Sequence, residues 1–223
     1  MALEAFDSLY QRAAERKGGE KALNELLGPA SDQQALTQLG DDRILSAFTK
    51  KVFQSGFVWK VIENKWPGFE AAFDNFDPPR VAFYADDDID RLMSDKAIVR
   101  NGAKIEATIH NARFVTDIAK EHGSFGTFLA EWPIDDQIGL MDVFKKRGKR
   151  LSGMTVQYFL RFAGWDAYIL SQDVTAALIR EGVIDKPATS KTALKAVQTA
   201  FNEWANTSGK MRTEISRTLA LSV

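Results

Sequence analysis

Apolar residues recur at three- and four-residue spacings along most of the chain, which is the periodicity of amphipathic helices. One such stripe covers residues 3–27 and is interrupted at Gly18-Gly19, and another covers residues 104–121 and ends at Gly123. Strand-like alternation of apolar and polar residues is not evident in any segment. The pattern therefore predicts an all-α chain of roughly ten helices joined by short loops.

Length and composition restrict the class of protein. A chain of 223 residues can form one large domain or two smaller lobes, and 45% hydrophobic with 26% charged residues is typical of a folded globular protein. An apolar run long enough to cross a bilayer is missing, as is a secretory signal, so we expect a cytoplasmic protein without a membrane partner. The chain has no cysteine and only two histidines, which argues against disulfides, a metal site or another cofactor.

Positive charge is concentrated next to one glycine turn. The net charge is only −1, but five lysines and arginines lie within residues 145–150, directly before Leu151-Ser152-Gly153. Glycine has no Cβ, so the turn can approach a ligand closely, and the free N–H groups that open the next helix suit a phosphate. This arrangement favours binding of a nucleic-acid backbone. The same residues also fit a solvated basic helix end followed by an ordinary helix–helix turn.

A second candidate site lies in residues 53–76, which contain seven large aromatic side chains. Most of these rings must be buried, because exposing all of them would be costly. Around the Gly56 break, however, a flat base could stack on one of the rings of residues 53–59 while Gln54 contacts its hydrogen-bonding edge. An aromatic core with a glycine bend would give the same pattern.

A single acid, Asp173, opens the amphipathic segment that follows the hairpin. As an exposed helix cap it needs no further function. As a partly buried carboxylate beside a DNA-facing hairpin, it could stabilise positive charge on a sugar or orient an attacking water.

In this order and spacing, the segments resemble the helix-hairpin-helix DNA glycosylases, in particular the 3-methyladenine DNA glycosylase I family. The resemblance covers about residues 41–165 and rests on several blocks. These are DDRILSAF with FQSGFVWKVI, FEAAFDNFDPPRVA, DRLMSDKAIVRNGAKIEATIHNARF and KKRGKRLSGMTVQYF.

The resemblance implies a helix-hairpin-helix glycosylase fold in two helical lobes, with residues 1–223 forming one domain and the hairpin at about 143–164. It implies a monofunctional glycosylase of base excision repair that cleaves the N-glycosidic bond of alkylated purines of the 3-methyladenine type. Its partner would be double-stranded DNA with a damaged base, bound by a monomer associated with the nucleoid. The base pocket would contain Lys51, Phe53, Gln54 and Trp59, and the DNA backbone would contact Lys149, Arg150, Ser152, Gly153, Met154 and Thr155.

The chain departs from the family pattern in several places. The family's terminal zinc-binding Cys and His residues and its Tyr-His-Asp-x-x-Trp-Gly motif are absent. Lys51 stands where the family has a Glu that contacts the base. Gln157 stands where bifunctional members of the superfamily have a nucleophilic lysine, and Asp173 aligns with the superfamily's catalytic carboxylate. Two alternatives therefore stay open, namely a non-catalytic DNA lesion-binding protein and a glycosylase for a different damaged base.

Overall fold

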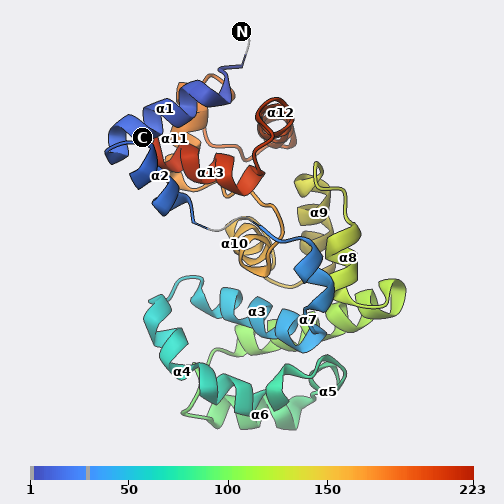
Figure 1. Cartoon of the computed structure of the whole chain (residues 1–223). Helices are drawn as coiled ribbons and strands as arrows, with labels where there is room; N and C mark the ends of the chain where they lie inside the picture. The colour runs from blue at the N-terminus through green and yellow to red at the C-terminus, as the bar shows by residue number, and fades with distance from the viewer. Residues whose placement is uncertain (1–2, 29–30) are drawn as a thin grey trace. The chain divides into compact units, whose positions relative to one another are not determined.

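The computed structural model describes residues 3–28 and 31–223, and within them the regular structure is entirely helical. The all-α prediction is confirmed, although more helices are present than the roughly ten expected from the periodicity. In chain order the helices are α1 Phe6–Lys17, α2 Glu20–Leu27, the 3-10 helix η1 Gln34–Gln38, α3 Asp41–Gln54, α4 Trp59–Ala72, η2 Asp74–Phe76, α5 Pro78–Ala82, α6 Asp86–Ser94, α7 Gly102–His122, α8 Phe125–Glu131, α9 Gln137–Arg147, α10 Met154–Ala163, α11 Gln172–Arg180, α12 Lys191–Ser208 and α13 Arg212–Leu221 (Figure 1).

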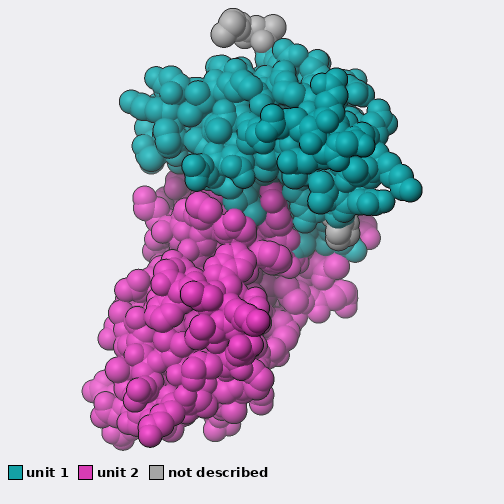
Figure 2. Space-filling model, turned by 90° about the vertical axis from the view of Figure 1, so that its left-hand side faces the viewer, with its two compact units in different colours: residues 1–32, 133–139, 164–223 teal, residues 33–132, 140–163 magenta. Residues whose placement is uncertain are grey.

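The chain divides into two compact units (Figure 2). Unit 1 combines residues 1–32, 133–139 and 164–223, and unit 2 combines residues 33–132 and 140–163. Both units are therefore assembled from segments that are distant in the sequence. In the described residues, no helix is long and apolar enough to cross a bilayer.

The core of unit 2 is built around one aromatic ring. Phe48 of α3 is fully buried, and four other buried rings lie with their centroids within 6.4 Å of its own. Aromatic pairs at these separations stabilise a core through both buried area and ring geometry. They are contributed by four different helices, so the cluster fixes α7, α8, α9 and α10 against α3. Its members are Phe114, Phe125, Phe144 and Phe159.

Gly68 does not break a helix as its residue type suggests. It lies inside α4, next to Pro67. A Cβ at this position would lie 2.6 Å from the carbonyl oxygen of Ala97, so only glycine allows this close approach of two backbone segments. Glycine here serves packing rather than chain reversal, which the sequence alone does not distinguish.

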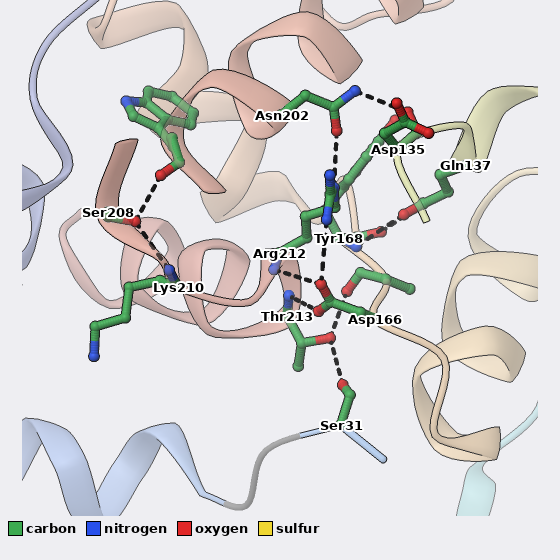
Figure 3. A network of polar contacts seen from close by, with 12 residues as sticks. Ser31, Asp135, Gln137, Asp166, Tyr168, Asn202, Ser208, Lys210, Arg212 and Thr213 are labelled. Carbon is green, nitrogen blue, oxygen red and sulfur yellow. Dashed lines mark hydrogen bonds and ion pairs between the residues drawn. The ribbon is translucent and has the colours of Figure 1, made fainter. Parts of the chain in front are cut away.

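Unit 1 contains a buried polar network at the start of α13 (Figure 3). The carboxylate of Asp166 accepts hydrogen bonds from the backbone N–H groups of Arg212, at 2.9 Å, and Thr213, at 2.7 Å. The Arg212 guanidinium lies 3.6 Å from the same carboxylate and donates to Asn202 at 2.8 Å. Because a buried carboxylate is costly without partners, these contacts give Asp166 a structural function at the helix N-terminus.

Candidate nucleic-acid interface and base site

The turn between α9 and α10 presents an open backbone surface at Gly153. This residue has a φ of +53°, and a Cβ built on it would meet nothing within 4 Å. Gly148, at the other end of the turn, is tightly packed, because its Cβ would lie 2.8 Å from the Phe144 carbonyl oxygen. Leu151 is buried, whereas Ser152 is exposed. The turn is thus anchored on one side and accessible on the side where α10 begins.

Asn111, a buried residue of α7, holds this turn in place. Its side-chain oxygen accepts a hydrogen bond from the Lys149 N–H at 2.8 Å, and its amide nitrogen donates to the Lys149 carbonyl at 3.1 Å. The neighbouring His110 places Nε2 2.9 Å from the carbonyl oxygen of Arg147. Two consecutive residues of α7 therefore fix the backbone that leads into the hairpin turn.

We expect the replacement of Asn111 by alanine to loosen the hairpin turn without unfolding the unit. The variant loses both bonds and leaves the partly buried N–H and carbonyl groups of Lys149 without this partner, so the cost is about 1–3 kcal/mol. Hydrogen exchange would show the Lys149 amide exchanging faster in the variant. Thr108→Ala is the control, because the Thr108 hydroxyl bonds only within α7, to the Lys104 carbonyl. Equal protection of Lys149 in N111A and wild type would contradict this function of Asn111.

Two of the five cations around the hairpin are already neutralised. Arg147 binds Glu121 with both terminal nitrogens, at 2.7 and 2.6 Å, and keeps the pKa of that carboxyl below its usual value. Lys149 lies 3.1 Å from Glu106. Among the described residues, Lys145, Lys146 and Arg150 form no ion pair, and all three are exposed. These three side chains therefore have no carboxylate partner in the described part of the chain, whereas Arg147 and Lys149 pair with Glu121 and Glu106.

The aromatic segment places Trp59 at the surface, as the first residue of α4, with 42% of the residue exposed. Its ring packs edge-on against Tyr158 of α10 at 5.7 Å, and Tyr158 stacks on Phe162 at 6.3 Å. Phe162 is 66% exposed. By contrast, Phe53 is fully buried against Phe69, so its ring is not accessible to a base.

Lys51 points into this aromatic surface. Its ammonium donates to Gln54 Oε1 at 3.0 Å and lies 4.9 Å from the ring centroid of Trp59 and 4.0 Å from that of Phe162. Burial lowers the pKa of Lys51, and the charge of Lys50 lowers it further, against an opposing effect of Glu63. The structure therefore brings three of the predicted pocket residues together, and adds Phe162 and Tyr158, which the sequence analysis missed.

The loop that carries Trp59 is held by a second buried residue of α7. The Lys104 ammonium donates to the carbonyl oxygens of Phe53, at 3.1 Å, and Ser55, at 2.7 Å, and burial lowers its pKa. A cation bonded to the last carbonyls of α3 also suits the negative end of the helix dipole. Lys104 thus fixes the end of α3 from which the Trp59 loop begins.

Asp173 lies in unit 1, in the first turn of α11. It is not the helix cap, because the Ser171 hydroxyl accepts the bond from the Val174 N–H. Its carboxylate is exposed and not partly buried, which was the second alternative, and it forms no hydrogen bond or ion pair with any described residue. In unit 2, Gln157 is buried and its amide nitrogen lies 3.9 Å from the sulfur of Met141.

A clamped glycine hairpin and an exposed aromatic surface in one helical unit define a helix-hairpin-helix protein that binds DNA. A family model described as methyladenine glycosylase matches residues 35–146. The chain belongs to the methyladenine glycosylase family, which confirms the resemblance seen in the sequence.

Similar proteins extend this result. The DNA-3-methyladenine glycosylase 1 of Escherichia coli K12 is 30% identical over 130 residues, covering 50% of this chain and 70% of its own. The Haemophilus influenzae DNA-3-methyladenine glycosylase is 32% identical over 76 residues, which cover 34% of this chain and 41% of that protein. 

Among solved structures, 3-methyladenine DNA glycosylase I from Staphylococcus aureus aligns with a TM-score of 0.50 and 28% identity, covering 57% of this chain and 78% of its own. A variant 3-methyladenine DNA glycosylase I in complex with 3-methyladenine aligns with a TM-score of 0.50 and 27% identity, covering 70% of this chain and 91% of that one.

The family's zinc site does not fit this chain. No cysteine is present in the sequence, and within the part of the chain that the structure describes, no group of three or more His, Asp or Glu side chains could hold a metal ion.

Proposed function

We propose that this protein is a monofunctional DNA glycosylase of base excision repair, which cleaves the N-glycosidic bond of alkylated purines of the 3-methyladenine type. The observation that carries this proposal is the exposed ring of Trp59 beside the buried amide of Gln54, in the same unit as the clamped hairpin. A flipped base needs a flat surface for stacking, which the exposed ring of Trp59 supplies, and the amide oxygen of Gln54 lies close to that ring through their shared contact with the Lys51 ammonium.

The hairpin is the part of the protein that binds the backbone of double-stranded DNA. Backbone N–H groups of Gly153, Met154 and Thr155 start α10 and suit a phosphate, and Arg150 and Ser152 flank them on the exposed side of the turn. Such contacts fix the position of the duplex without reading its sequence. They fit a monomeric cytoplasmic enzyme that acts along the nucleoid on rare damaged bases.

Chemistry at the sugar requires little acid catalysis when alkylation has already made the base a good leaving group. The C1′–N bond breaks, its electrons leave with the base, and water adds to C1′ with loss of a proton. Asp173 stabilises the positive charge that develops on the sugar and orients that water. Gln157 carries an amide and not an amine, so no Schiff base forms there and an abasic site is the product.

Base release is the test of this function. Methylated genomic DNA, incubated with sub-stoichiometric protein, is expected to yield free 3-methyladenine in repeated turnovers, because the products do not remain covalently bound. Chromatography of the released bases measures it, with unmethylated DNA as the control. Without any released base, the proposal would be wrong.

A non-catalytic lesion-binding protein is the second candidate. The ammonium of Lys51, which lies within the base site where the family has a carboxylate, favours it because a cation repels a cationic purine. This function predicts tighter binding to abasic and damaged duplexes than to intact DNA, without free base at any enzyme concentration. A single catalytic turnover per protein molecule would already contradict it.

A further inference from the structure

The base site contains a cation that belongs to the protein itself. The Lys51 ammonium contacts the rings of Trp59 and Phe162 and donates to Gln54. A ring face and an amide oxygen are the groups that a flat cationic base would use in this site. Lys51 therefore satisfies the same partners that the substrate needs.

Within the described part of the chain, one hydrogen bond to Gln54 and two cation–π contacts hold this ammonium in place, without a counter-ion. Lys51 is half-buried, and among the described residues no carboxylate lies within ion-pair distance of it. A partly desolvated charge without a counter-ion is costly, and cation–π contacts offset this cost only in part. The side chain is long and unbranched, so it can leave the site for solvent when a better ligand arrives.

The adjacent lysine shows what a purely structural contact looks like. The Lys50 ammonium also lies over a tryptophan, 4.4 Å from the ring centroid of Trp66. That ring is stacked against Phe69 and Phe76, and its N–H donates to Glu70 at 2.8 Å. Trp66 is therefore committed to the core, whereas Trp59 keeps 42% of its surface exposed.

We propose that Lys51 is a specificity-determining residue that acts as an internal competitor for the base site. Its ammonium occupies the cation position over Trp59 and Phe162, and a base binds only by displacing it. This inference rests on the proposed glycosylase function and adds a minimum interaction strength that a base needs in order to bind. A base must gain enough stacking and hydrogen bonding to replace the lysine, so weakly bound normal bases are rejected.

The first experiment measures binding of the free base 3-methyladenine by calorimetry. Lys51→Met removes the charge while keeping the length of the side chain, and we expect it to bind roughly tenfold more tightly than wild type, which corresponds to about 1.4 kcal/mol. Lys51→Arg keeps the charge and should bind as weakly as wild type. Lys50→Met, which removes the neighbouring lysine, should leave the affinity unchanged. Equal affinity of K51M and wild type would overturn the proposal, as would an equal gain in K50M.

The second experiment observes the wild-type lysine directly and does not depend on any variant. With lysine labelled at the ε-carbon, the Lys51 methylene should show an upfield ring-current shift in NMR spectra, because it lies near the faces of two aromatic rings. Titration with 3-methyladenine should return this signal toward the position of a solvated lysine. A signal that keeps its shift at saturation would overturn the proposal.

These measurements separate the inference from the proposed function. If wild type releases base from methylated DNA and K51M binds 3-methyladenine with unchanged affinity, competition by Lys51 is refuted and the proposed glycosylase function stands. If K51M binds 3-methyladenine more tightly and no variant releases base, competition by Lys51 stands and the proposed glycosylase function is refuted.

Discussion

Replacement of Asp173 by asparagine is expected to lower the rate of base release by roughly 100- to 10,000-fold, the usual range for a positioned acid–base group. Asparagine keeps the shape of the side chain but carries no charge, so it can neither stabilise a cationic sugar nor take a proton from water. The exposed position of Asp173 and its lack of partners among the described residues leave the carboxylate available for this chemistry. Single-turnover kinetics on methylated DNA would measure the loss.

Two controls make this result specific. Binding of D173N to an abasic duplex should stay close to wild type, because the hairpin and the aromatic surface are unchanged. Asp7→Asn provides the matched variant, since Asp7 is also an exposed acid in the first turn of a helix in unit 1. A base-release rate in D173N that stays near that of D7N would show that Asp173 is only a surface residue of α11.

Alanine at Gly153 is expected to weaken binding to double-stranded DNA by roughly 10- to 150-fold. The estimate follows from losing a charge-assisted hydrogen bond to phosphate, worth about 1.5–3 kcal/mol. The new Cβ would meet no protein atom, so it would instead occupy the space in which the phosphate approaches the turn. Fluorescence anisotropy with a labelled duplex measures the affinity, and its dependence on salt shows whether a phosphate contact is lost.

The backbone strain of this variant needs its own control. Gly123, at the C-terminus of α7, also has a positive φ, +86°, and open space where a Cβ would lie. Gly123→Ala in the same unit therefore also places a Cβ on a backbone with positive φ, at a cost of about 1–2 kcal/mol or more, away from the hairpin. If G123A loses as much DNA affinity as G153A, the effect is one of stability and not of phosphate access.

Much of the fold follows from periodicity in the sequence, and its limits have physical causes. The all-α class, the division of the first stripe at Gly18-Gly19 and the hairpin turn were predicted. The role of Gly68 could not be predicted, because a glycine that permits close packing looks the same in sequence as one that ends a helix. Two helical lobes were expected, but the segments that make up each unit could not be predicted, because this depends on contacts between segments distant along the chain.

The sequence named several residues of the candidate site, but it did not show which of their side chains are exposed or buried. Lys51, Gln54 and Trp59 lie together as expected, but Phe53 belongs to the core, since its position in α3 points it at Phe69. Phe162 was missed because a single exposed ring in an apolar helix gives no distinct signal. For Asp173 the sequence left a helix cap and a partly buried carboxylate open, but Ser171 is the cap and Asp173 is exposed in the first turn of α11.

The sequence did contain a signal for the residues of α7 that hold the aromatic loop and the hairpin turn. Lys104, Thr108 and Asn111 are polar and lie four and three residues apart, which places them on the same face of α7 as the buried Val115. A polar stripe on a buried face is unusual and indicates side chains that hold other parts of the backbone. Two of the three do so, one at the aromatic loop and one at the hairpin.

This polar stripe fixes the distance between the end of α3, held by Lys104, and the hairpin turn, held by Asn111. Lys104 and Asn111 are seven residues apart, which is about 10.5 Å along the axis at the helical rise of 1.5 Å per residue. The separation between the end of α3 and the hairpin turn is therefore encoded in the length of one helix and not in flexible loops. Inserting one residue between these two positions would rotate the Lys104 side chain about the helix axis by about 100° relative to that of Asn111. The span from the end of α3 to the hairpin turn is thus set by the helix.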